Sequence, residues 1–252
     1  HLSGAGAQSA HMPKTPPATR APSAPLSAPQ KALHKLGLVR DIDLALHLPL
    51  RYEDATRIVR LRDAREGDVV QIEATVISCE VSYRPRRQLL VEVDDGSERC
   101  TLRFFSFYPS QIKALEAGKR LRVRGEVRGG FLGRTMMHPS FESAGGPLPA
   151  ALTPVYPTVA GLPQAYLRKA VLSGLARAEL GDTFPPEDFA PLNGSGQGGI
   201  WTLREALAFL HHPTPDVSLD TLEDHSHPAW QRLKAEELLA QQLSQLQSRR
   251  ER

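Results

Sequence analysis

The chain has 252 residues, of which 40% are hydrophobic and 23% charged, and its formal net charge is +3, which allows one large domain or two modest ones. Apolar runs fall far short of the ~18 residues of a membrane span, and no CxxC pair occurs, which excludes a membrane protein and a cysteine-based metal cluster. We therefore expect a cytoplasmic protein with no membrane partner, in which Cys79 and Cys100 are buried free thiols.

Residues 1–30 are rich in Ala, Pro and Ser and lack a hydrophobic period, so they predict a disordered, tag-like tail. Within it, the pair His11-Met12 is typical of a cloning junction and makes residues 1–11 a candidate vector-derived stretch. Residues 31–60 are predicted to form a short helical segment. Gly37 separates its two helices, because glycine favours a helix stop.

Residues 61–145 alternate between apolar and polar positions, a pattern typical of strands with one buried face. In the first strand the phase of the alternation shifts by one between Val76 and Ile77, which predicts a β-bulge that bends the strand. Further strands are expected at 88–93, 99–105, 121–127 and 134–141, with a tight turn at Asp95-Gly96 and a helix over 110–116.

Five strands, the first of them bent, with a helix between the third and the fourth, follow the order of an OB-fold. We therefore predict an α+β protein in which a five-stranded OB-fold β-barrel, residues 61–145, is flanked by N-terminal and C-terminal helical segments. Other small barrels show similar alternation. OB-folds bind single strands across their second and third strands, helped by the first loop.

The third predicted strand carries the principal candidate residues, in the sequence TLRFFSFYP over residues 101–109. Strand alternation places two apolar side chains on one face and Arg103 with Phe105 on the other. A cation beside a flat ring suits a nucleic-acid strand, because the charge holds phosphate and the ring stacks on a base. Phe107 and Tyr108 add rings where the strand ends. The alternative interpretation is that the aromatic residues all belong to the core.

Basic residues surround this strand. Between Arg99 and Met137 there are nine Lys and Arg against two Glu, a local excess typical of a nucleic-acid footprint. A solvated surface of an arginine-rich protein is the alternative. The remaining candidate DNA-binding residues come from the first loop and from the last barrel strands: Tyr83, Arg84, Arg86, Arg87, Arg128 and Arg134. In the fourth strand, Arg120, Arg122 and Arg124 share the outward parity of Arg128.

Residues 146–228 are predicted to be an extended linker followed by helices. The spacing of Leu167, Val171 and Leu175 predicts a helix over 164–177. Another begins after Thr202, where Glu205 completes a capping box. Residues 229–252 predict one long helix that reaches the chain end without a C-cap, as expected of a truncated segment. Its inward face is expected to carry Leu233, Leu238, Leu239, Leu243 and Leu246.

Catalytic motifs are missing from the sequence. It contains no GxxxxGK[ST] phosphate loop, GxSxG elbow, HExxH pair or dinucleotide fingerprint. The pairs His211-His212 and His225/His227 lie beside prolines, without carboxylate or cysteine at ligand spacing, so they do not predict a metal site. We expect no catalytic residue, metal or cofactor within these residues.

With these elements placed, the chain from about Leu33 to Arg249 resembles the N-terminal half of the RecG family, bacterial ATP-dependent helicases for branched DNA. The motifs that carry the resemblance occur in order: LHKLGLVRDIDLALHLPLRYED, RFFSF, MMHPSFE, LTPVYPTVAGLPQAYLRKAV, LREALAFLHHP and HPAWQRLKAEELLAQQLS. The ordered set is far more specific than any one of its members.

The resemblance implies that the barrel is a wedge domain, which splits strands at replication forks and Holliday junctions during DNA repair and recombination. It implies that Phe105, with Phe107 and Tyr108 as alternatives, faces the bases at the branch point. Residues 229–252 would connect to two RecA-like motor domains. ATP and Mg²⁺ would belong to those absent domains, so this fragment is expected neither to hydrolyse ATP nor to unwind DNA.

The implied partners are branched DNA and single-stranded DNA, with a single-strand-binding protein as a further candidate. Two other functions stay open from the residues alone. One is a general OB module for single-stranded DNA or RNA, and the other is a protein-interaction scaffold built on the C-terminal helices.

Overall fold

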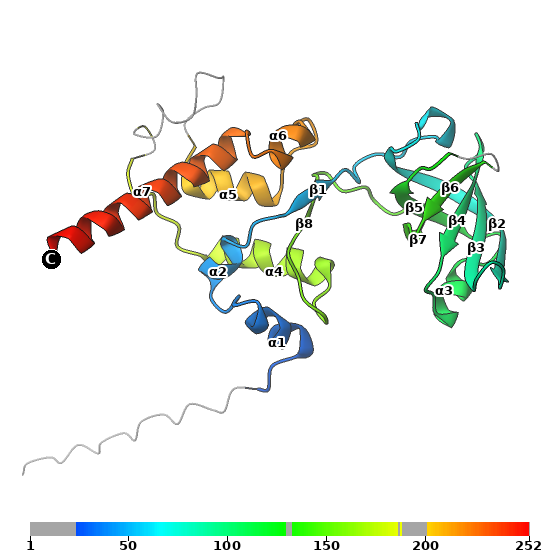
Figure 1. Ribbon diagram of the computed structural model, residues 1–252, viewed down its shortest axis with the longest axis horizontal. Coiled ribbons are helices and arrows are strands. Elements are labelled where there is room, and N and C mark those ends of the chain that lie inside the picture. Colours follow the sequence, from blue (N-terminus) through cyan, green and yellow to red (C-terminus); the bar gives the residue numbers. More distant parts are fainter. Residues whose placement is uncertain (1–23, 130–132, 186, 188–200, 252) are drawn as a thin grey trace, which may run out of the picture.

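The protein is described by a computed structural model that covers residues 24–129, 133–185, 187 and 201–251. Figure 1 shows two units, a β-barrel and a group of helices, joined by a narrow pair of strands, β1 and β8. The barrel unit comprises a 3-10 turn (Leu61–Asp63), β2 (Val69–Ser82), β3 (Gln88–Asp94), β4 (Arg99–Phe104), α3 (Pro109–Ala114), β5 (Arg120–Glu126), β6 (Arg134–Met137) and β7 (Ser140–Ser143). The helical unit comprises α1 (Ala28–Lys35), α2 (Asp41–Ala45), β1 (Arg51–Glu53), β8 (Thr153–Val155), α4 (Gln164–Arg177), α5 (Leu203–His211), α6 (Leu219–Glu223) and α7 (Pro228–Arg250).

The barrel closes through its last segment. The sheet order is β6-β4-β3-β2-β5-β7, with β6 parallel to β4 and β7 antiparallel to β5. Because β6 and β7 are consecutive pieces of chain, one segment pairs with both edges of the sheet. The predicted fifth strand, 134–141, is therefore divided in two at His138, whose φ is +47°, and Pro139. The five-stranded OB-fold β-barrel is confirmed, with its fifth strand in two pieces.

The first barrel strand bends where the sequence predicts it. The pairing of β2 with β3 shifts register between Val76 and Ser78, so Ile77 is the extra residue of a β-bulge. Val76 is buried, whereas Ile77 is 42% exposed. A bulge increases local twist, which lets one strand contribute to both sides of a small barrel.

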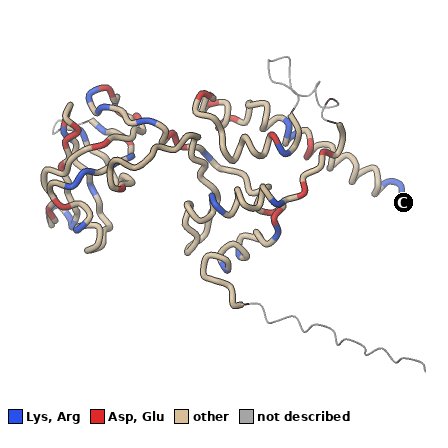
Figure 2. Tube along the Cα trace, turned by 180° about the vertical axis from the view of Figure 1, so that it is seen from behind, with Lys and Arg blue, Asp and Glu red and all other residues tan. Residues whose placement is uncertain are grey.

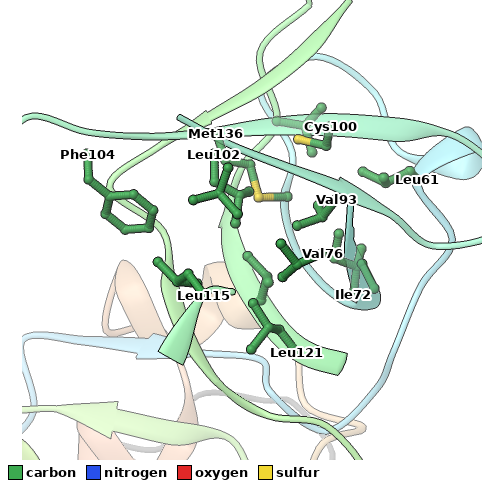
Figure 3. Close-up of a cluster of buried hydrophobic side chains, with 14 of the residues drawn as sticks. Leu61, Ile72, Val76, Val93, Cys100, Leu102, Phe104, Leu115, Leu121 and Met136 are labelled. Carbon is green, nitrogen blue, oxygen red and sulfur yellow. The ribbon is translucent and has the colours of Figure 1, made fainter. Parts of the chain in front are cut away.

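The barrel has its own hydrophobic core. Inward side chains from every strand meet inside it, as Figure 3 shows for Val76, Val93, Leu102, Phe104 and Met136. The turn between β3 and β4 is fixed by the carboxylate of Asp95, which accepts hydrogen bonds from the backbone N–H groups of Ser97 and Glu98. Cys100 lies in this core as a free thiol. Burial raises the pKa of the Cys100 thiol to about 12.

The helical unit combines the two ends of the chain. β1 pairs antiparallel with β8, with Arg51 opposite Val155 and Glu53 opposite Thr153. Helices α2 and α4 cross closely at Gly174, where an added Cβ would lie 2.5 Å from the Cβ of Leu44. Residues 31–60 and 146–228, which the sequence divides into separate segments, therefore share packed cores.

The N-terminal tail is shorter than predicted. Helix α1 begins at Ala28, and Ser27 caps it by accepting a hydrogen bond from the backbone N–H of Gln30. The expectation of disorder up to residue 30 is wrong for these positions, because a capping box outweighs the low hydrophobicity of the preceding sequence. Residues 1–23, which contain the proposed cloning junction, lie outside the described residues.

Helix α7 is anchored only in its first half. The side chain of Arg232 is fully buried, donates to the carbonyl of Trp201 at 2.9 Å, and forms ion pairs with Asp182 and Glu236. The second half extends past α5 (Figure 1). The expected inward leucine face is wrong there, since these leucines are exposed: Leu238, Leu243 and Leu246. Apolar spacing identifies a helix face but not the element that covers it.

His211 at the end of α5 has a packing role. The His211 ring is buried, with Nδ1 2.8 Å from the Tyr156 hydroxyl and Nε2 2.7 Å from the carbonyl oxygen of Ala45. A carbonyl oxygen can only accept, so Nε2 carries the proton and Nδ1 accepts from the hydroxyl. Burial lowers the pKa of His211. No helix in the described part of the chain is long and apolar enough to span a membrane.

Candidate nucleic-acid interface

Strand β4 presents the two faces that its sequence predicts. Leu102 and Phe104 are buried in the barrel core, whereas Arg103 and Phe105 are half-buried on the outer side. Arg103 lies opposite Leu90 of β3 and Met137 of β6 in the strand pairing. Apolar neighbours on both sides can cover its aliphatic stem. Its Nε is buried without a hydrogen-bond partner in the described structure.

Phe105 lies between two groups from other elements. The guanidinium carbon of Arg86 is 3.5 Å from the centroid of the Phe105 ring. The His138 ring lies 5.5 Å from it, tilted by 58°. The backbone N–H of Phe105 also points at Nε2 of His138, over 3.4 Å. The ring is therefore held at the outer end of β4 rather than in the core.

Phe107 does not offer an exposed ring. It is only 7% exposed and belongs to the barrel core, so this structure does not present its ring to a ligand, and its contact with DNA stays an untested prediction. The physical reason is that β4 ends at Phe104, and the turn before α3 brings the next aromatic residue back inside. The guanidinium carbon of Arg87 lies 4.1 Å from the Phe107 ring centroid and covers its outer side.

The two tyrosines predicted to contact DNA have exposed side chains, as such a contact requires. Tyr83 is 71% exposed at the start of the loop between β2 and β3, and Tyr108 is 68% exposed. Tyr108 precedes α3 and is fixed by its backbone N–H, which donates to Oε1 of Gln111 at 2.9 Å. Both rings can contact a ligand without unfolding the barrel.

The loop between β2 and β3 supplies cations without acidic partners. Arg84, Arg86 and Arg87 are exposed, and no carboxylate in the described residues pairs with any of them. At the other end of β4, by contrast, Arg99 pairs with Glu92 at 2.9 Å and with Asp94 at 3.4 Å. The loop end of β4 therefore offers three arginines to an anionic ligand, whereas Arg99 at the other end is already paired.

Several other predicted arginines are occupied by the fold. Arg134 donates to the carbonyl of Ala64 at 2.7 Å and pairs with Glu98 at 2.5 Å, so the fold already engages its guanidinium, and its contact with DNA stays a prediction. Arg128 stays exposed, with only Glu126 3.6 Å away. Its hairpin continues into residues 130–132, which lie outside the described residues.

Two of the outward arginines of β5, Arg122 and Arg124, are engaged by carboxylates. Arg122 is buried, pairs with Glu73 at 2.8 Å and donates to the carbonyl of Gly146. Hydrogen bonds from the Arg122 guanidinium and from the backbone N–H of Gly145 hold the pKa of Glu73 below its usual value. Arg124 pairs with Glu53 of β1 at 2.7 Å. Arg120 and Arg128 stay exposed, so the outward arginines of this strand are only partly engaged by the fold. Figure 2 shows acidic residues interspersed with basic ones over the barrel.

His138 is the residue of this surface that the sequence prediction missed. It is exposed, adopts a left-handed backbone, and donates its backbone N–H to the carbonyl of Arg103 at 2.8 Å. A histidine with positive φ is uncommon and often marks a functional or strained position. The signal in the sequence is the pair His138-Pro139 inside a predicted strand, since proline interrupts strand pairing.

Comparison with known proteins identifies the family of this chain and supports its fold. A family model described as the RecG wedge domain matches residues 27–177. The ATP-dependent DNA helicase RecG of Escherichia coli (strain K12) is 41% identical over 218 residues, which cover 85% of this chain and 31% of that relative. The helicase of the same name from Acidithiobacillus ferridurans is 35% identical over 217 residues, covering 84% of this chain and 30% of the relative.

A solved structure of RecG bound to a three-way DNA junction matches 93% of this chain and 33% of its own chain. Its TM-score is 0.58 and its sequence identity is 24%, so it supports the fold. The chain spans about a third of the length of the curated relatives it matches. With the family model covering more than half of the sequence, the chain belongs to the RecG wedge domain family.

Proposed function

We propose that this chain is the branched-DNA-binding region of a longer ATP-dependent DNA helicase that acts at replication forks and Holliday junctions in repair and recombination. The relatives that carry this helicase name are about three times as long, so ATP, Mg²⁺ and unwinding are assigned to the rest of the longer protein. One observation carries most weight: the Phe105 ring lies outside the barrel core, beside arginines that no described carboxylate neutralises.

The energies of the interactions support this assignment. Separating the base pair at a branch loses a DNA stacking step, on the order of 1.4 kcal/mol. Stacking of a base on an aromatic side chain contributes roughly 1–3 kcal/mol. One well-placed ring can therefore offset the unstacking at a junction without reading the sequence of the DNA. Phe105 is our first choice for this ring, and Tyr108 and Tyr83 are the exposed alternatives.

Specificity for branches follows from shape. A linear duplex presents no unstacked base, so it can use the arginines of the loop but not the ring. A fork offers phosphates and at least one unpaired base together. We propose single-stranded DNA as a weaker ligand, the cytoplasm as the location, and a single-strand-binding protein as an additional partner at such sites.

Competition binding tests this function. The chain is titrated into a labelled fork at fixed ionic strength, in the presence of unlabelled fork, linear duplex, plain single strand or structured RNA. We expect the fork to compete best. Equal competition by single strand or RNA would favour a general OB module instead, and absence of any binding at low salt would favour a protein-interaction scaffold.

The salt dependence of fork binding tests the loop arginines. Replacing Arg84, Arg86 and Arg87 with Ala should reduce the magnitude of the slope of log K against log salt by about 2 to 3, since each phosphate contact contributes about 0.7–0.9. The control is Arg99→Ala, because this arginine is already paired with Glu92 and Asp94. It should leave the slope nearly unchanged. An unchanged slope in the triple variant would remove the loop from the interface.

A further inference from the structure

The arginine loop covers the ring that we assign to DNA. The guanidinium carbon of Arg86 lies 3.5 Å from the Phe105 ring centroid, the spacing at which flat groups stack. Arg87 covers the Phe107 ring at 4.1 Å. Two consecutive loop residues thus rest on aromatic residues at the end of β4. The face of Phe105 that carries Arg86 is not open in the DNA-free protein.

The other contacts of Phe105 come from the barrel itself. His138 packs beside the ring and accepts, over 3.4 Å, from the Phe105 backbone N–H. His138 is tied in turn to the carbonyl of Arg103. These contacts belong to the closed strand ladder, whereas Arg86 belongs to an exposed loop. Of the groups that contact the ring, Arg86 is the one that can leave without disturbing the barrel.

Arg86 has a better partner when DNA is present. Among the described residues no carboxylate pairs with its guanidinium, which rests on the Phe105 ring instead. An exposed cation–π contact corresponds to roughly a two- to five-fold effect on an equilibrium. Stacking of a base on an aromatic ring corresponds to roughly a five- to 150-fold effect. A base should therefore displace the guanidinium, which can then pair with a phosphate.

We propose that Arg86 occupies, in the DNA-free protein, the face of Phe105 that one unpaired nucleobase takes at a branch, and that binding moves its guanidinium onto a phosphate. This inference rests on the proposed function. Its site is the slot formed by Phe105, His138 and Arg86, and its ligand is a single unstacked base together with the adjoining phosphate. Until a base arrives, Arg86 shields the exposed ring from water.

Nuclear magnetic resonance of the Arg86 side chain tests the displacement directly. Ring current from Phe105 should shift the side-chain protons of Arg86 upfield in the DNA-free chain, and Phe105→Leu should abolish that shift. Adding the fork to saturation should abolish it as well. Saturable fork binding with the shift retained would overturn the displacement but leave the proposed function intact. Absence of fork binding would overturn both.

A double-mutant cycle gives a second test with a predicted sign. Because the DNA-free protein must break the Arg86–Phe105 contact, Phe105→Ala should weaken fork binding two- to five-fold more in an Arg86→Ala background than in the unchanged protein. The matched control is Arg84→Ala, an exposed arginine of the same loop with no ring contact among the described residues. Its cycle with Phe105 should show no coupling. Additive effects for Arg86, or coupling of opposite sign, would contradict the displacement.

Discussion

Replacing Phe104 with Ala is expected to destabilise the barrel by roughly 3–5 kcal/mol, whereas replacing Phe105 with Ala is expected to weaken fork binding by roughly 1–3 kcal/mol. The two residues are adjacent in sequence and identical in type. Phe104 is 4% exposed and packs edge-to-face against Phe141 in the core. Phe105 is half-buried outside it, and the exposed Arg86 and His138 lie against its ring. The same substitution therefore removes core packing at one position and a binding surface at the next.

Two signals separate these effects. The chain has two tryptophans, Trp201 and Trp230, and both belong to the helical unit. Denaturant unfolding of the barrel is followed by nuclear magnetic resonance signals of the amides in its strands, and unfolding of the helical unit by tryptophan fluorescence. Phe104→Ala should lower the barrel midpoint and leave the tryptophan transition in place, because the two units have separate cores.

Replacing Phe105 should leave the barrel stable and weaken fork binding. Phe105→Ala should change barrel stability by less than about 1 kcal/mol, the usual size of an exposed cation–π contact. Fork affinity is then measured on folded protein. A large loss of stability together with unchanged fork affinity would place the Phe105 ring in the core and exclude it from the DNA interface.

Replacing Arg232 with Met is expected to destabilise the helical unit by roughly 3–5 kcal/mol. The Arg232 side chain is 0% exposed and forms ion pairs with Asp182, 2.5 Å away, and Glu236, 2.7 Å away. Met fills similar volume but leaves two carboxylates that are about four-fifths buried without their shared cation. Removing one member of a buried ionic group leaves uncompensated charge, which costs far more than loss of a surface pair.

Tryptophan fluorescence measures this loss, because Arg232 donates to the backbone of Trp201 and lies two positions from Trp230. The control is Arg249→Met on the exposed end of the same helix, which should change stability by no more than about 0.5 kcal/mol. Fork binding by the barrel should survive Arg232→Met at temperatures where the helical unit is partly unfolded. A change below 1 kcal/mol would show that this ionic cluster does not hold α7 in place.

Much of the fold could be predicted because its signals are local. The alternation of residues 99–105, the phase shift at Ile77 and the capping box at Thr202 each depend on a few neighbouring residues, and the structure contains all three features. The order of the strands and of α3 then indicated the OB-fold. The ordered motifs indicated the family, because recognising them requires only the sequence and no knowledge of contacts.

Which arginines are available at the candidate site depends on contacts between residues that are far apart in the sequence. Arg122 and Glu73 are 49 residues apart in the chain, and Arg134 and Ala64 are 70 apart. No local pattern shows that these arginines are occupied while Arg84, Arg86 and Arg87 are not. His138 reaches Phe105 only because the last strand closes the barrel.

The sequence by itself determined which side chains alternate along each strand, where the helices begin, and which family the chain resembles, because backbone geometry imposes those periods within a few residues. The tertiary structure decided that Phe107 lies inside the core, that Arg122 and Arg124 pair with carboxylates, and that the leucines at the end of α7 are exposed. The physical reason is that periodicity assigns a residue to a face, whereas burial and charge pairing depend on what packs against that face.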